Sequence, residues 1–218
     1  MSGTLGSSVP LVDLSALPLL FVVLAFSLTI HEAAHAWSAD LLGDPTALRS
    51  GRVSLSPPAH LSVTGALIFP LLSFFSGFPL IGWSRPIPVT AGELGRRWRA
   101  KVVLIWAAGP AANLALAVGA GLLIRVGGAV TGSGLDSLSL SFLVRTIDVN
   151  LLLALLNLLP VPPLDGGNLL AAVLPDPMGG ALRHVRPYGP VLLYVLILSG
   201  VLSAAILPIR ASLRAVLL

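Results

Sequence analysis

Long runs of apolar residues are the feature that most constrains how this 218-residue chain can fold. Crossing the roughly 30 Å hydrocarbon core of a bilayer takes about 20 helical residues. Four runs are long enough, at about residues 17–42, 101–124, 141–159 and 188–206. Only 10% of the residues are charged, whereas about a quarter are charged in an ordinary soluble domain. We therefore expect the chain to fold with lipid as its solvent.

A fifth apolar stretch, residues 61–80, is a poor candidate for a continuous helix because it contains two glycines and two prolines. Residues 81–89 follow with the sequence IGWSRPIPV, whose prolines suit only an edge strand. We expect a re-entrant or half-inserted segment and then a β-hairpin, both buried against protein. The predicted fold is an all-α polytopic membrane protein with four to six membrane segments and this re-entrant/β-hairpin element after the first.

Basic residues gather between the first and second long apolar runs. The positive-inside rule places this group in the cytoplasm and the N-terminus outside. The net charge is +4. The basic residues stand beside apolar runs and form no basic stripe with interleaved aromatic residues, so nucleic-acid binding is not expected. The group consists of Arg49, Arg52, Arg85, Arg96, Arg97, Arg99 and Lys101.

The pentad HEAAH, residues 31–35, lies inside the first apolar run. In an α-helix, His31 and His35 stand one turn apart on the same face, which is the geometry that chelates one zinc ion. Glu32 lies beside them and is placed to take a proton from a water that the metal activates. Ionisable residues at membrane depth are costly unless they pair or bind something, which favours a functional site over a solvated helix end.

A third metal ligand has to come from elsewhere, because catalytic zinc commonly has three protein ligands. The chain has no cysteine, and Asp165 is the best-placed carboxylate. The prolines of residues 160–163 end the preceding helix, and Gly166 and Gly167 allow the backbone to turn sharply. We expect Asp165 on unwound backbone, pointing into the bundle. An N-cap role in a following helix is an equally good interpretation of these residues alone.

Two asparagines in apolar helices, Asn113 and Asn157, are further candidates for the site. A buried amide could orient a ligand, hold the substrate backbone or stabilise a developing oxyanion. Hydrogen bonding between helices is the alternative, and for Asn113 it is about equally good. Asn150 could join the same polar seam or only pack helices, so it is left outside the predicted site. His60 and His184 lie among prolines and arginines at predicted membrane interfaces, where a histidine that faces solvent is unremarkable, and neither is assigned to the metal.

Four segments in chain order together resemble the signature segments of the site-2 proteases, a family of intramembrane zinc metalloproteases. They are HEAAH (31–35), GWSRPIPV (82–89), AGPAAN (108–113) and NLLPVPPLDGG (157–167). The chain resembles the compact bacterial or archaeal members that lack PDZ and CBS domains. The resemblance implies a single membrane-embedded metalloprotease domain over residues 1–218, with a catalytic core at about 17–174 and a C-terminal membrane helix at about 188–208.

The resemblance implies that one Zn²⁺ per chain is bound by His31, His35 and Asp165. Glu32 would be the catalytic base, and Asn113 and Asn157 would lie near the metal. The implied activity is regulated intramembrane proteolysis, the hydrolysis of peptide bonds in or near transmembrane segments of membrane-protein substrates. Its partners would be those substrates and the lipid bilayer.

The depth of the site in the membrane follows from the position of the pentad. His31 is about 21 Å along a helix that starts near residue 17, at about 1.5 Å per residue. The metal is therefore expected nearer the cytoplasmic side, in a multi-pass protein of a prokaryotic cell membrane.

Other functional classes fit parts of the sequence. A transporter or channel could use intramembrane His and Asp to bind an ion or relay protons, but it leaves the HExxH spacing unexplained. A catalytically silent relative that binds membrane proteins would be expected to have a damaged ligand set, whereas the set here is complete. A soluble zinc peptidase conflicts with the composition.

Overall fold

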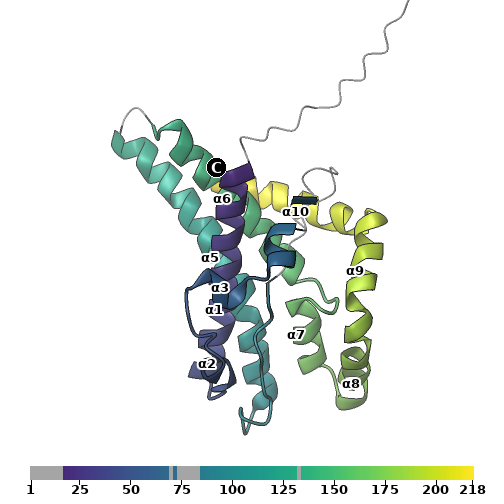
Figure 1. Ribbon diagram of the computed structural model, residues 1–218. Coiled ribbons are helices and arrows are strands. Elements are labelled where there is room, and N and C mark those ends of the chain that lie inside the picture. The colour runs from purple at the N-terminus through teal and green to yellow at the C-terminus, as the bar shows by residue number, and fades with distance from the viewer. Residues whose placement is uncertain (1–16, 69–70, 73–83, 132–133) are drawn as a thin grey trace, which may run out of the picture.

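Three long helices form the centre of the protein. The computed structural model describes residues 17–68, 71–72, 84–131 and 134–218. The helices α1 (Leu17–Leu41), α5 (Trp98–Thr131) and α6 (Ser137–Asn157) pack against one another (Figure 1). Each is long and apolar enough to cross a membrane. The predicted all-α architecture is confirmed for the described residues.

The ends of these helices follow from local chemistry. Asp136 begins α6 by accepting hydrogen bonds from the backbone N–H groups of Leu138, at 3.0 Å, and Ser139, at 2.9 Å. At the C-terminal end of α1, Nζ of Lys101 donates to the carbonyl of Leu42 at 2.8 Å. Lys101 is the only lysine in the sequence, and it ties the end of α1 to the start of α5.

Short elements connect α1 to α5: α2 (Thr46–Arg49), α3 (Pro57–His60) and the π-helical turn η2 (Thr64–Ile68). The expectation for His60 is wrong, because its side chain is fully buried and its Nε2 lies 2.7 Å from the carbonyl oxygen of Ser54. This histidine holds two turns of the connecting segment together and does not face solvent.

The predicted β-hairpin is not supported by the described residues. Their strand pairing is limited to one antiparallel bridge between Leu61 and Ser84, beside which the N–H of Arg85 donates to the carbonyl of His60 at 2.7 Å. Pro86 and Pro88 lack the N–H donors that a longer ladder needs. The re-entrant interpretation of residues 61–80 falls largely on residues 69–70 and 73–80, which lie outside the described residues.

Shorter helices complete the chain after α6. They are α7 (Asp165–Val173), α8 (Asp176–Val185), the 3₁₀ turn η3 (Arg186–Tyr188), α9 (Gly189–Leu198) and α10 (Val201–Leu217). In Figure 1, α9 stands apart from the central helices and α10 returns toward them.

The C-terminal span predicted at residues 188–206 is not one continuous helix, because the helix breaks at Gly200. Gly200 has a φ of 75°, a conformation that glycine adopts without steric cost. The segments Asp176–Leu198 and Val201–Leu217 are bent by 72° relative to each other. The described residues therefore contain three candidate membrane spans, or four if the bent pair counts as one, and the predicted range of four to six segments is not supported.

Small residues let the central helices approach closely. Ala33, Ala36 and Ala39 on α1 are fully buried, and so is Ala117 on α5. Small side chains at helix contacts are typical of membrane bundles, in which packing and hydrogen bonds take over from the hydrophobic effect. The close contact between α1 and α5 fixes the positions of the side chains that project between them.

Candidate metal centre

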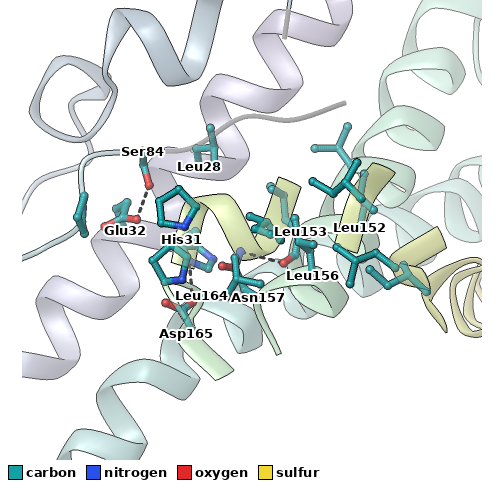
Figure 2. A pocket seen from close by; sticks show the side chains of 18 of the residues that line it. Leu28, His31, Glu32, Ser84, Leu152, Leu153, Leu156, Asn157, Leu164 and Asp165 are labelled. Carbon is teal, nitrogen blue, oxygen red and sulfur yellow. Dashed lines mark hydrogen bonds and ion pairs between the residues drawn. The ribbon is translucent and has the colours of Figure 1, made fainter. Parts of the chain in front are cut away.

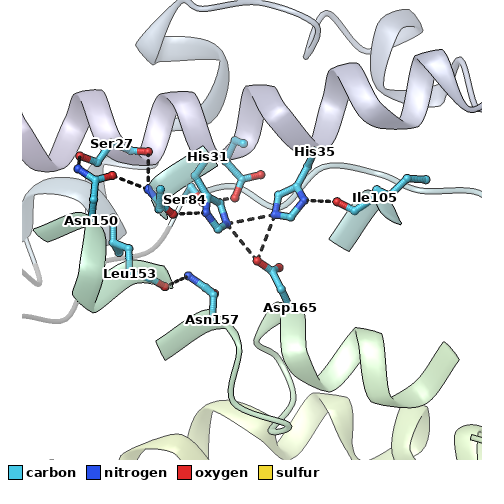
Figure 3. A network of polar contacts seen from close by, with 11 residues as sticks. Ser27, His31, His35, Ser84, Ile105, Asn150, Leu153, Asn157 and Asp165 are labelled. Atoms are coloured by element: carbon cyan, nitrogen blue, oxygen red, sulfur yellow. Dashed lines mark hydrogen bonds and ion pairs between the residues drawn. The ribbon is translucent and has the colours of Figure 1, made fainter. Parts of the chain in front are cut away.

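Three of the predicted site residues converge between α1 and α7. His31 and His35 lie one turn apart on α1, and their Nε2 atoms are 3.1 Å from each other. Each Nε2 is also 3.1 Å from Oδ2 of Asp165 (Figure 3). The exposed fractions are 4%, 1% and 6% for His31, His35 and Asp165. Among the residues that the structure describes, this is the only group of three or more His, Cys, Asp or Glu placed to hold a metal ion.

Hydrogen bonds on the far side of each ring orient the two histidines. Nδ1 of His31 is 2.6 Å from Oδ1 of Asn113, and Nδ1 of His35 is 2.7 Å from the carbonyl oxygen of Ile105. Both partners are oxygens that only accept, so each Nδ1 carries the ring proton. Each neutral ring then presents the lone pair of Nε2 toward Asp165. This is the arrangement found in metal-ligating histidines.

The converging atoms fit a tetrahedral zinc ion. Bonds of about 2.0–2.1 Å place the ligand atoms of such an ion roughly 3.3 Å apart, close to the 3.1 Å observed. A carboxylate oxygen and two ring lone pairs that face one point fit a shared cation, which a metal ion supplies.

The position of Asp165 differs from the expectation in one respect. It is the first residue of α7 and does not lie on unwound backbone. A helix can start there because Gly166 and Gly167 lie against the loop before it: a Cβ on Gly167 would be 2.6 Å from the nitrogen of Pro162. The N-cap position belongs to Leu164, and the Asp165 carboxylate instead points at the histidines (Figure 3).

Gly109 on α5 keeps the space beside the histidines open. A Cβ at this position would be 2.6 Å from Cε1 of His31 and would also collide with Nε2 of His35. Any side chain here would therefore fill the volume next to the two metal-facing nitrogens. Sequence reasoning missed this residue, although it lies inside the AGPAAN segment.

Glu32 lies beside the cluster and is 6% exposed. Its Oε1 accepts a hydrogen bond from the hydroxyl of Ser84, whereas its Oε2 is buried and has no hydrogen-bond partner among the described residues. A buried, unpaired carboxylate oxygen is costly unless something binds to it. Ser84 was not predicted as a site residue, although it belongs to the GWSRPIPV segment.

The two predicted asparagines occupy different places. Asn113 contacts the ring of His31 directly, as described above. Asn157 donates from Nδ2 to the carbonyl of Leu153 at 3.0 Å, and among the described residues it has no hydrogen bond to either histidine. Its side chain instead lines the cavity that also exposes Asp165 (Figure 2).

A cavity opens onto the cluster of His31, His35 and Asp165. Its volume of about 900 Å³ is at the upper end of the range for ligand pockets. His31, Glu32 and Asp165 form one part of its wall, and leucines of α6 continue it (Figure 2). Its other side is formed by α9 and α10, with Leu193, Tyr194, Ile197, Leu202, Ile206 and Arg210. The cavity is therefore apolar over most of its surface and polar at the cluster.

Two bacterial proteins are similar to the chain over most of its length. The protein named "Putative zinc metalloprotease YwhC" of Bacillus subtilis (strain 168) is 35% identical over 202 residues, which cover 89% of this chain and 87% of that protein. The protein named "Putative zinc metalloprotease Rip2" of Mycolicibacterium smegmatis is 33% identical over 183 residues, which cover 81% of this chain and 65% of that protein. No family model matches the chain, and no solved structure matches it.

Proposed function

The chain belongs to the zinc metalloprotease family of YwhC and Rip2, and from this membership we propose that it is an intramembrane protease of the site-2 type. It hydrolyses peptide bonds in or near transmembrane segments of membrane-protein substrates. The observation that carries the proposal is the placement of the His31, His35 and Asp165 cluster in the wall of a large apolar cavity among membrane-spanning helices.

Nε2 of His31, Nε2 of His35 and the Asp165 carboxylate would hold one zinc ion per chain. When bound, zinc supplies Lewis acidity, which polarises a carbonyl group and makes water more acidic. The protein contributes the fixed orientation of both rings and the open space beside Gly109.

Glu32 moves the protons of the reaction. Glu32 lines the cavity from which water and substrate reach the cluster, and its carboxylate accepts the proton of the attacking water. The same carboxyl then returns the proton to the leaving amine. Ser84 holds the carboxylate through Oε1, which leaves Oε2 free for this exchange.

The apolar walls of the cavity favour a substrate segment that is itself apolar. Leu28, Leu153 and Leu156 line it beside the cluster, and a lipid-soluble segment can exchange contacts with bilayer for contacts with these side chains. Asn157 stands at the same wall with its amide near Asp165 and is placed to bind a backbone group of an unwound substrate. Unwinding is needed because a helix hides its peptide bonds in its own hydrogen-bond ladder.

The cluster lies nearer the end of α1 at Leu41 than the end at Leu17. His31 is about 15 Å from the first and about 21 Å from the second, at about 1.5 Å per residue. The basic residues of the following segment lie beyond Leu41, so cleavage occurs nearer the cytoplasmic face.

Replacing the base separates catalysis from metal binding. In Glu32→Gln we expect cleavage of a tagged model transmembrane substrate in liposomes to fall at least about 100-fold, because general base catalysis commonly contributes about 100-fold or more. Zinc content should stay at the wild-type level, since Glu32 is not a ligand. A zinc chelator should stop the wild-type enzyme in the same assay.

Zinc-dependent cleavage by wild type and none by the variant would support the proposal. Full cleavage by Glu32→Gln would contradict the role of Glu32. Wild-type protein that binds no zinc would contradict the metalloprotease itself, and ion flux without cleavage would point to a transporter.

A further inference from the structure

Asn150 is a fully buried amide in the middle of α6, and all of its polar atoms are hydrogen-bonded. Its Nδ2 donates to the hydroxyl of Ser27 and to the carbonyl of Thr146, each at 2.8 Å. Its Oδ1 accepts from Nδ2 of Asn113 at 2.7 Å. A line of hydrogen bonds therefore runs from α6, through Asn113 on α5, to the ring of His31 on α1 (Figure 3).

Two backbone carbonyls fix the direction of this line. The carbonyl of Thr146 can only accept, so the NH₂ group of Asn150 has to face it and Oδ1 has to face Asn113. The carbonyl of Ser27 lies 3.4 Å from Nδ2 of Asn113 and sets the orientation of that amide in the same way. Of the two acceptors for Asn113, the one supplied by Asn150 is much the closer.

The orientation of Asn113 decides which ring nitrogen of His31 carries the proton. With its Nδ2 held by Asn150, Asn113 presents Oδ1 to Nδ1 of His31. The ring proton then stays on Nδ1, and the lone pair of Nε2 points at Asp165. If the amide turned over, its NH₂ group would face Nδ1, the ring proton would move to Nε2, and His31 would lose its metal-binding lone pair.

We propose that Asn150 is a positioning residue of the metal centre, which acts through Asn113 to hold His31 as the tautomer that binds metal. The inference rests on the proposed zinc site, because its effect on metal affinity presupposes that site. Asn150 is fully buried and does not line the cavity, so it is not itself a catalytic residue.

His35 provides a reference within the same molecule. Its Nδ1 is held by the backbone carbonyl of Ile105, which no substitution of Asn150 removes. A change confined to the hydrogen-bond line should alter His31 and leave His35 unchanged. General damage to packing between α1 and α5 should alter both rings.

Three variants separate the amide from the volume that it fills. Asn150→Leu keeps the forked shape of the side chain, with methyl groups in place of the amide O and NH₂, and removes the acceptor for Asn113. Asn150→Asp should be protonated when buried, so that it still accepts from Asn113 and donates through its O–H. Thr146→Val is the control, because it removes a buried hydroxyl one turn away that donates to the carbonyl of Phe142 and takes no part in the line of hydrogen bonds to His31.

The first measurement is zinc affinity by competition with a chelator of known affinity. We expect Asn150→Leu to bind zinc about 10-fold more weakly, at the lower end of the roughly 10- to 100-fold effects of groups that orient metal ligands. Asn150→Asp and Thr146→Val should match wild type. Equal affinity of Asn150→Leu and wild type would overturn the proposal.

The second measurement is the tautomer of each histidine in metal-free protein, from NMR of ¹⁵N-labelled histidine. Wild type should have the His31 proton on Nδ1, and Asn150→Leu should move part of it to Nε2 while His35 stays as it was. Equal changes at both rings would overturn the proposal in favour of a packing role. Because this readout needs no zinc, it also decides the inference if the zinc site itself proves wrong.

A milder variant covers the case in which Asn150→Leu does not fold. The hydroxyl of Asn150→Thr can bond to the carbonyl of Thr146 one turn earlier, but it is too short to replace the acceptor of Asn113. It should show the same loss of zinc affinity and the same change at His31. A wild-type tautomer in this variant would also overturn the proposal.

Discussion

The central helices α1, α5 and α6 and the C-terminal pair α9 and α10 line the same cavity, but they are built differently. The central helices bury polar side chains that are hydrogen-bonded to one another, such as Asn113 and Asn150. In the C-terminal pair, the buried residues are Gly189, Leu202 and Ile206, and most of the surface is exposed apolar side chain. One wall of the cavity is therefore fixed by a network of buried hydrogen bonds. The other is held mainly by apolar contact, together with the ion pair of Arg214 and a hydrogen bond from Arg125 to the carbonyl of Val216.

This difference separates two tasks. The wall formed by the central helices carries the groups that a reaction needs. Such groups have to be held within about 0.5 Å of their working positions, so they tolerate little displacement. The apolar wall has only to complete a space that accepts an apolar segment. Substitutions in the central helices should change metal binding and turnover, whereas substitutions in the C-terminal pair should change the apparent affinity for substrate.

The largest effect is expected at Gly109, where a methyl group would enter the space between the histidines. Gly109→Ala should lose most of its zinc and cleave about 100-fold more slowly, because about 1–3 kcal/mol of overpacking falls on the metal ligands. Zinc content and cleavage rate measure this. Gly119→Ala on the same helix is the matched control, since a Cβ there meets nothing within 4 Å. Wild-type zinc content in Gly109→Ala would contradict the assigned position of the metal.

A smaller effect is expected at Gly200, the break between α9 and α10. An alanine there would be strained by roughly 1 kcal/mol at a φ of 75°, and the bend of 72° should change. We expect KM for a transmembrane substrate to rise several-fold with zinc affinity unchanged. Ser199→Ala, at a neighbouring residue with helical φ, is the control. A loss of zinc in Gly200→Ala would show that the two walls are not independent.

The smallest effect is expected at the ion pair between α10 and α6. Arg214 Nε lies 2.9 Å from Oδ1 of Asp148, and both side chains are partly exposed. A double-mutant cycle with Arg214→Met and Asp148→Asn should give a coupling free energy of about 0–1 kcal/mol in thermal unfolding. A much larger coupling would mean that the C-terminal pair is held by directional bonds after all.

The sequence predicted the local features of the site better than the contacts between distant segments. The HEAAH spacing placed two histidines on one face of a helix, and α1 ends at Leu41, within one residue of the prediction. The prolines before Asp165 indicated this residue as the third ligand, and the structure places its carboxylate beside the histidines. These signals are local because they depend on helical periodicity and on the backbone limits of proline and glycine.

Sequence reasoning could not establish the contacts between residues far apart in the chain. It left open whether Asn150 joins a polar seam, because Asn150 meets Asn113 only through the rotation of α5 and α6 about their axes, which periodicity in apolar helices does not reveal. The break at Gly200 was missed because the flanking residues are apolar enough for one span. The hairpin was predicted from the apolar residues 81–89. Pro86 and Pro88 in this stretch lack N–H donors, and the described residues pair only through the bridge between Leu61 and Ser84.

The bend at Gly200 also has a consequence for how such proteins diversify. The metal cluster takes its residues from α1 and α7, so α9 and α10 can change by mutation without disturbing the chemistry. Exchanging the chain after Gly189 between two relatives should therefore transfer substrate preference as a module. A lineage could acquire new targets by altering about the last thirty residues while inheriting its reaction unchanged.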